Sequence, residues 1–394
     1  MKKNKEKILV ALSGGVDSAV AAALLVARGF DVTGAFMVNY EADERENGKP
    51  WSKCWTADYR DALRVAAGLG VPLIRLDFTK EYKKYVLDYL YREYELGNTP
   101  NPDVLCNQYI KFGFWLKKAK QLGFSKLATG HYARTNKITN YELRITNCET
   151  VSLLEAMDKN KDQTYFLHQL GQDQLRDVLF PIGEYTKPQV RKLAKKFGLP
   201  VAEKEESMGI CFVGEVPMKE FLESKVKTKP GKVILSSGEV IGEHDGLAFY
   251  TIGQRHLGIN NYPPSPIGAS DGRGKLIINN YRDKPLYVVG KKMDANELIV
   301  GNENDPLLYK KTIRVIDVNW ISGQEPKFPL KCLVRLRHRQ PLQTGSISKP
   351  EENKTPSDNG LIIKFNRSQR APATGQFAVF YRDEKCLGGG IISG

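Results

Sequence analysis

The stretch from Ile8 to Ala27 constrains the fold of this 394-residue chain more than any other. Ile8-Leu9-Val10-Ala11-Leu12 is an uninterrupted apolar run, which is typical of a parallel strand that is buried on both faces. Residues 19–27 carry the apolar positions of a packed helix. The turn between them, Ser13-Gly14-Gly15-Val16-Asp17-Ser18, therefore joins the end of a strand to the start of a helix.

This turn has the chemistry of a phosphate-binding loop. Gly14 and Gly15 let the backbone approach a ligand closely, and the N–H groups of the helix start point to the same place. Ser13 and Ser18 add hydroxyl donors, while Asp17 can cap the helix or help to hold a magnesium ion that bridges phosphates. A glycine pair before Asp-Ser also forms an ordinary turn with a helix cap. The string lacks the Gly-Lys-Ser/Thr of a Walker loop and the Gly-x-Gly-x-x-Gly of a dinucleotide site.

Strands and helices alternate through the next seventy residues. We expect strands over 31–38 and 72–78 and helices over 56–67 and 81–95. This alternation predicts an α/β fold with a doubly wound parallel sheet, whose ligands bind beyond the carboxyl ends of the strands. Met37 closes the second strand at that edge, where it is either a core residue or an apolar surface for an adenine ring.

A proline-containing segment then interrupts the helical pattern. Pro100 and Pro102 exclude regular structure over residues 98–102, and we expect the helix to restart near Cys106. A cysteine in the first turn of a helix has its thiolate stabilised by the macrodipole. Asp103 is near enough to donate or accept a proton. Taken alone, Cys106 reads as a structural residue, since free cysteines are usually buried and apolar in character.

Composition narrows the classes of protein. A net charge of +14 favours a polyanionic partner such as nucleic acid. Six cysteines without dense spacing or a Cys-x-x-Cys pair argue against a secreted disulfide framework and against a bound metal. The chain has no apolar run long enough to span a membrane, and its basic N-terminus lacks a cleavage signal. We therefore expect a soluble, cytoplasmic protein with no membrane partner.

Two of these segments resemble one known family. The string Ser13–Ser18 resembles the loop of the PP-loop ATP pyrophosphatases, and Thr99–Asn107 resembles the catalytic loop of the tRNA-specific 2-thiouridylases. The resemblance implies that ATP, with Mg²⁺, is cleaved to AMP and pyrophosphate to adenylate the carbon-2 oxygen of the wobble uridine. It implies these ATP contacts: Ala11, Leu12, Ser13, Gly14, Gly15, Val16, Asp17, Ser18, Met37 and Gly130.

The same resemblance assigns the sulfur chemistry. Ile210-Cys211-Phe212 matches the family segment whose cysteine carries a persulfide, although Glu206 and Met208 depart from the common residues nearby. It implies that Cys106 resolves the intermediate by forming a Cys106–Cys211 disulfide, with Asp103 as a third catalytic residue. The expected sulfur donor is a cysteine desulfurase or a relay protein. The other cysteines have no matching context and are expected to be structural: Cys54, Cys148, Cys332 and Cys386.

Three short segments resemble the family's tRNA contacts. The expected contacts are Asn101, Pro102, Asp103, Lys161, Asp162, Gln163, Arg337 and His338. His338 stands where the family commonly has tyrosine and can stack on a base. In residues 335–340 cations alternate with other residues, so that in a strand alternate cations would face the same side. This pattern fits a strand that contacts RNA and equally a solvated edge strand.

Helical periodicity fades beyond residue 213, and short β-rich runs between Gly, Pro and Asn replace it. We expect a PP-loop domain over 1–214, a small β-rich domain over 215–284, and a C-terminal β-barrel over 285–394 that contacts tRNA. Strands are expected near 232–234, 247–250, 286–289, 313–315, 333–335 and 362–364, with 387–391 closing the barrel. Residues 346–359 read as a disordered insertion.

Two other functions fit parts of the chain. A PP-loop ligase or amidotransferase that adenylates a small molecule would need neither both cysteines nor the basic β domains. A non-catalytic tRNA-binding module would have no use for an intact phosphate loop.

Overall fold

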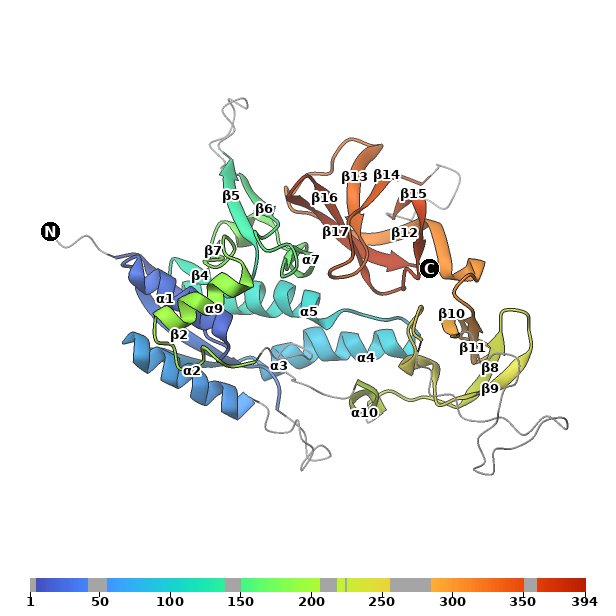
Figure 1. The fold of residues 1–394 in the computed structure, drawn as a ribbon, viewed down its shortest axis with the longest axis horizontal. Helices are drawn as coiled ribbons and strands as arrows, with labels where there is room; N and C mark the ends of the chain where they lie inside the picture. The colour runs from blue at the N-terminus through green and yellow to red at the C-terminus, as the bar shows by residue number, and fades with distance from the viewer. Residues whose placement is uncertain are drawn as a thin grey trace.

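The structure is a computed structural model that describes residues 5–41, 55–138, 150–205, 218–223, 225–255, 285–350 and 360–394. Figure 1 shows an N-terminal α/β domain, a small β domain at the far end of the molecule, and a C-terminal barrel packed above the helices. Among the described helices, none is long and apolar enough to cross a membrane.

The N-terminal domain is built on a parallel sheet with the strand order β3-β2-β1-β4-β7. The strands are β1 (Lys7–Ala11), β2 (Asp31–Val38), β3 (Leu73–Asp77), β4 (Lys126–Ala128) and β7 (Val178–Leu179). Ile8 and Val10 belong to one buried cluster and Leu9 to another, because neighbouring residues of a strand face opposite sides. The expected doubly wound α/β architecture is confirmed.

Different helices cover the two faces of the sheet. The cluster with Ile8 contains residues of α1 (Val16–Ala27), α2 (Trp55–Leu69) and α9 (Lys187–Lys196). The cluster with Leu9 contains the helical region from Thr79 to Gln121. That region comprises α3 (Thr79–Tyr82), a π-helical segment (Lys83–Leu87), α4 (Asp88–Glu95), α5 (Pro102–Leu105), a second π-helical segment (Cys106–Trp115) and α6 (Leu116–Gln121).

The helix that carries Cys106 begins earlier than expected. Asn101 is its N-cap and Pro102 its first residue, because proline at the first helical position loses no hydrogen bond. Cys106 therefore lies in the second turn and not in the first, and the macrodipole argument made from the sequence does not hold for it.

The middle domain is a four-stranded sheet with the order β10-β11-β8-β9. Its strands are β8 (Gly231–Leu235), β9 (Val240–His244), β10 (Tyr287–Lys292) and β11 (Glu297–Gly301), and α10 (Met218–Glu223) precedes them. β11 pairs with β8, so residues 287–301 belong to the middle sheet and the expected boundary at 285 falls too early. Residues 247–249 form a 3-10 turn where a strand was expected.

The C-terminal domain is a closed barrel of six strands in the order β12-β15-β14-β13-β16-β17, with β12 paired to β17. They are β12 (Tyr309–Trp320), β13 (Leu330–Arg335), β14 (Gln343–Ser348), β15 (Leu361–Arg370), β16 (Phe377–Arg382) and β17 (Lys385–Ser393). β17 closes the barrel as expected. β13 ends at Arg335, so the cations of residues 336–339 lie on a turn and do not alternate along a strand.

Two further points concern the chain around the barrel. Residues 346–348 are the end of β14 and not part of an insertion, while 351–359 lie outside the described residues. A hairpin of the N-terminal domain, β5 (Arg134–Ile138) and β6 (Thr150–Leu154), joins the barrel sheet because β6 pairs with β17. Backbone hydrogen bonds thus connect the first and last domains.

Candidate active site

The loop after β1 is braced by its own serine hydroxyls. Ser18 Oγ donates to Gly15 O at 3.0 Å and accepts the Ser13 amide at 3.2 Å, and the two hydroxyl oxygens lie 3.1 Å apart. Gly15 is the N-cap of α1 and makes no side-chain cap bond, so the first N–H groups of the helix face the loop. The arrangement suits an anionic ligand, since N–H groups and the helix dipole both favour negative charge there.

Two glycines allow a second segment to approach this loop. Gly14 has a φ of +77°, and a Cβ at this position would lie 2.2 Å from the carbonyl oxygen of Asp58 in α2. A Cβ at Gly130 would lie 2.6 Å from the Ser18 amide nitrogen. Only glycine fits at either position, and the structure brings Gly130 directly against the loop. The expected contact of Gly130 with ATP stays a prediction.

Asp17 is held by two side chains from distant segments. Lys187 Nζ lies 2.8 and 2.9 Å from its two carboxylate oxygens, and the Tyr132 hydroxyl donates to Asp17 Oδ1 at 2.9 Å. Lys187 is the first residue of α9. Sequence reasoning missed Lys187, because nothing around it beyond a helix start marks it as a partner of residue 17.

A second lysine reaches the loop from the other side. Lys204 Nζ lies 3.1 Å from Gly14 O, 2.7 Å from Asp58 Oδ1 and 2.6 Å from Asp61 Oδ2. Burial opposes the charge of Lys204, but the hydrogen bonds to Asp58 and Asp61 outweigh it and raise the lysine pKa. Sequence reasoning missed this residue too. It lies next to the last described residue before Cys211, residue 205.

Met37 is 3% exposed and packs in the core cluster with Leu9 and Ala35. It lies one residue before the end of β2, beside Leu76 of β3. The structure therefore places it below the surface at the edge of the sheet where the loop lies. Its contact with adenine stays a prediction.

The segment with the expected catalytic residues forms the N-cap and the first turns of the helix that contains Cys106. Asn101 Oδ1 accepts the Val104 amide at 3.4 Å, and Asp103 is half-buried in the first turn. Cys106 is 0% exposed, with its thiol inside the core cluster that fills this face of the sheet. Cys211 lies outside the described residues, so the expected pair of cysteines is not tested.

His131 links the phosphate loop to the Cys106 helix. It follows Gly130, its Nδ1 lies 2.8 Å from Thr129 Oγ1, and its ring centroid is 5.7 Å from that of Phe112 in the helix. Burial, with a further contribution from Lys111, lowers the pKa of His131 well below its usual value. The imidazole is therefore neutral at physiological pH. The sequence motif around Gly130 contained this residue, but no role was assigned to it.

The expected tRNA contacts at 161–163 lie near Tyr132, the residue that follows His131. Asp162 is 2% exposed and accepts hydrogen bonds from the Ala156 amide, Thr164 Oγ1 and Arg335 Nη1 at 3.0, 2.7 and 3.0 Å. Its carboxylate thus faces the barrel interface and not the surface. Gln163 Oε1 accepts the Tyr132 amide at 2.9 Å, and Lys161 is half-buried.

Arg337 and His338 lie on the turn after β13. Arg337 Nη2 donates to Ala371 O and, at 3.4 Å, to Ile252 O of the middle domain. The His338 ring centroid lies 4.6 Å from that of Phe166 in α7 (Thr164–Leu167), and burial lowers the His338 pKa to about 4. Both residues therefore lie where the three domains meet. Their contact with tRNA stays a prediction.

Comparisons with known proteins cover the whole chain. Family models match residues 6–215 (tRNA methyl transferase HUP domain), 219–302 (tRNA methyl transferase PRC-barrel domain) and 310–392 (aminomethyltransferase beta-barrel domain). A Geobacillus kaustophilus protein named tRNA-specific 2-thiouridylase MnmA 2 is 43% identical over 392 residues, which is 99% of this chain and 95% of the relative. The chain belongs to the tRNA-specific 2-thiouridylase family.

Other members of the 2-thiouridylase family agree with this assignment. The MnmA protein of Legionella pneumophila strain Philadelphia 1 is 41% identical, with 98% of each chain covered. That of Francisella tularensis subsp. novicida is 40% identical, with 98% of this chain and 99% of the relative covered. The family expected from the sequence is confirmed, and with it the class of enzyme. A solved 4-thiouridine synthetase–RNA complex with bound ATP aligns at a TM-score of only 0.31, 17% identity, 56% of this chain and 50% of that one.

The loop after β1 has groups of the kind that a nucleotide phosphate and a divalent ion bind. The loop supplies backbone N–H groups for phosphates, and Asp17 with Ser18 supplies oxygen atoms of the kind that Mg²⁺ prefers. Within the described ranges, no group of three or more His, Cys, Asp or Glu side chains forms a metal site of its own.

Proposed function

We propose that this protein catalyses the ATP-dependent 2-thiolation of the wobble uridine of tRNA. The observation that carries the proposal is the placement of residues 129–131. Gly130 packs against the phosphate loop at Ser18, and the next residue packs against the helix that begins at Pro102 and contains Cys106. One short segment thus contacts both the loop proposed to bind ATP and the helix that carries Cys106, which supports the proposal.

The first step is adenylation. The carbon-2 oxygen of uracil attacks the α-phosphate of ATP, the bond between the α- and β-phosphates breaks, and pyrophosphate leaves. The N–H groups of Gly14, Gly15 and the first turn of α1 would stabilise the charge on the phosphates, and Asp17 with Ser18 would hold the Mg²⁺ that neutralises it. The step is needed because a uracil oxygen is a poor leaving group, whereas AMP is a good one.

The second step transfers sulfur. A sulfur donor, either a cysteine desulfurase or a relay protein, loads a persulfide onto Cys211. The terminal sulfur of the persulfide attacks carbon 2 and displaces AMP, so that the uridine is joined to Cys211 through an S–S bond. The Cys106 thiolate then attacks Sγ of Cys211. The S–S bond to the uridine breaks, which leaves 2-thiouridine and a Cys106–Cys211 disulfide that a thiol reductant must reduce. Asp103 is near enough to Cys106 along the helix to assist proton transfer.

The tRNA would bind across the junction of the three domains. The proposed contacts are Asn101, Pro102, Asp103, Lys161, Asp162, Gln163, Arg337 and His338. For Asp162, whose carboxylate is bonded inward, the contact would be through the backbone. The net charge of +14 supports a polyanionic substrate.

Mass spectrometry of nucleosides tests the proposal. Unmodified tRNA is incubated with the protein, ATP, Mg²⁺ and a cysteine desulfurase with free cysteine as the persulfide donor, and 2-thiouridine is measured. We expect it to form with the wild-type protein and not with Cys106→Ala or Asp17→Ala, while Cys332→Ala in the barrel core remains active. If ATP is cleaved to AMP but no thiolated nucleoside forms, the substrate is a different one and a small-molecule ligase is favoured.

A further inference from the structure

Residues 97–100 connect α4 to the helix that contains Cys106. The amides of Gly97 and Asn98 close the end of α4 by bonding Tyr94 O and Glu93 O. Pro100 cannot donate a hydrogen bond, and neither Thr99 nor Pro100 belongs to a helix or strand. The remaining polar groups of this segment must therefore find partners elsewhere.

The barrel supplies one set of partners. The Thr99 amide donates to Thr374 O at 2.8 Å, and Gln376 Nε2 donates to Thr99 O at 2.9 Å and to Pro100 O at 3.4 Å. Gly375, between these barrel residues, has a φ of +87°, and a Cβ there would lie 3.0 Å from the Thr99 amide nitrogen. The close approach of the two backbones requires this glycine.

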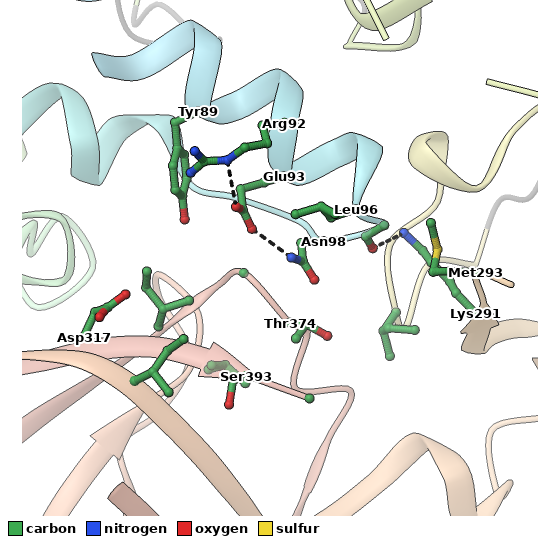
Figure 2. Close-up of a pocket in the computed structure, with 17 residues that line it drawn as sticks. Tyr89, Arg92, Glu93, Leu96, Asn98, Lys291, Met293, Asp317, Thr374 and Ser393 are labelled. Carbon is green, nitrogen blue, oxygen red and sulfur yellow. Dashed lines mark hydrogen bonds and ion pairs between the residues drawn. The ribbon is translucent and has the colours of Figure 1, made fainter. Parts of the chain in front are cut away.

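The middle domain supplies a second set. Lys291 Nζ donates to Gly97 O at 2.8 Å, and the hydroxyl of Thr99 donates to Thr251 Oγ1 at 3.3 Å. A Cβ at Gly97 would lie 2.4 Å from the sulfur of Met293. Figure 2 shows Lys291 and Met293 reaching the end of α4 from one side, with Thr374 and Ser393 of the barrel facing it from another.

A cavity of about 550 Å³ borders these contacts. Its lining includes Tyr89 and Leu96 of the α4 region, Lys291 of the middle domain and Ile392 of the barrel. Gly97 and Asn98 face this cavity and not a packed core. The hydrogen bonds to the two β domains therefore hold residues 97–100 in place, a task that close packing performs in a core. The position of the segment thus depends on both β domains.

We propose that residues 97–100 are a clamp point at which both β domains position the helix start that bears Cys106, with Gln376 and Lys291 as positioning residues for sulfur transfer. The inference rests on the proposed role of Cys106. Asn101 caps that helix directly after the clamped segment, so a shift of Thr99 moves the cap and the first turn. Misplacement of a reacting group by 1 Å can slow a reaction by about 100-fold.

The test uses the full-length protein with two pairs of variants. Gln376→Ala and Lys291→Met remove the clamp donors. Gln343→Ala removes a barrel glutamine that donates to Pro341 O and accepts from Gln369 Nε2, and Lys292→Met removes the neighbouring lysine, which pairs with Glu297 at the surface. Gln376→Glu keeps the shape of the side chain but loses the amide donor. The readouts are the kcat and KM for tRNA thiolation and hydrogen–deuterium exchange of the peptide 97–106.

We expect Gln376→Ala, Gln376→Glu and Lys291→Met to lower kcat by about tenfold, with KM for tRNA nearly unchanged, since each loses a hydrogen bond of the usual net strength at a positioning contact. Exchange in the peptide 97–106 should become faster in these variants and remain as in the wild type elsewhere. Gln343→Ala and Lys292→Met should match the wild type in both readouts.

Three results would overturn the inference. They are an unchanged kcat with unchanged exchange, an effect on KM alone, which would make Gln376 a simple RNA contact, and faster exchange spread over the whole chain. Exchange needs no substrate, so it separates the two proposals. If the wild-type protein forms no 2-thiouridine, the proposed function fails, while faster exchange confined to 97–106 still supports the clamp.

Discussion

The ammonium of Lys187 lies 2.8 and 2.9 Å from the two carboxylate oxygens of Asp17, although the two residues are 170 positions apart. The pair joins the start of α9 to the start of α1, beside the loop where phosphates would bind. It fixes the direction of the one carboxylate in the loop. It also adds the positive charge of the lysine to the positive end of the α1 dipole.

Asp17→Asn should lower tRNA-dependent pyrophosphate release by about 100-fold, because it removes the negative charge that would hold Mg²⁺ against the phosphates. Lys187→Met should lower it less, since the carboxylate remains. Asp31→Asn, at the exposed start of β2, is the matched control and should retain full activity. Activity of Asp17→Asn equal to that of the control would exclude a role for Asp17 in catalysis.

Cys211→Ser should abolish 2-thiouridine formation and leave tRNA-dependent pyrophosphate release unchanged. Adenylation uses the phosphate loop, whereas sulfur transfer uses the thiol. Both products can be measured in one reaction, by a phosphate-coupled assay and by nucleoside mass spectrometry. Loss of pyrophosphate release in this variant would contradict the division into two steps.

Arg335→Met should destabilise the protein by about 3–5 kcal/mol, because it removes the guanidinium that two buried carboxylates share, and Lys159 then remains as a cationic partner of Glu155 alone. Arg335 Nη2 lies 3.1 Å from Glu155 Oε1 and Nη1 lies 3.0 Å from Asp162 Oδ2, and all three side chains are nearly inaccessible. Thermal unfolding measures the effect. Arg64→Met, which breaks an exposed pair with Asp61, is the control and should shift the melting temperature little. Equal shifts for the two variants would refute the importance of the buried ion pairs.

Stability should fall as the pH is lowered from about 6.5 towards 4. Burial lowers the pKa of His168 to about 4, while the unfolded chain titrates near 6.5. Between these values the unfolded state binds more protons, so the free energy of unfolding rises with pH across this window and is fully regained above it. His168→Gln should reduce the slope without removing it, because His131 and His338 are shifted in the same direction. An unchanged slope in urea titrations at several pH values would disprove this assignment.

Binding of tRNA should weaken steeply with salt. The net charge of +14 predicts that several phosphates are neutralised on binding, and each releases counterions. The logarithm of the association constant should therefore fall linearly with the logarithm of the salt concentration, as measured by filter binding. A flat response would show that the positive charge does not contribute to the interaction.

Much of the N-terminal domain could be predicted from local sequence. The apolar run before Ser13, the glycine pair and the helical pattern after Ser18 are periodic or compositional signals, and each matches the element that the structure shows. The start of the helix that contains Cys106 has no such unambiguous local signal. The choice of Asn101 as a cap and Pro102 as the first helical residue competes with the reading of two prolines as an interruption, and only the structure decides between them.

The sequence by itself determined the α/β fold, the phosphate loop and the family, because short-range patterns carry them. The tertiary structure alone decided that Lys187 pairs with Asp17, that Lys204 binds Asp58 and Asp61, and that β11 joins β8 in the middle sheet. Contacts between residues far apart in the chain leave no periodic signal, because their partners are chosen by packing and by the need to pair buried charges and backbone groups.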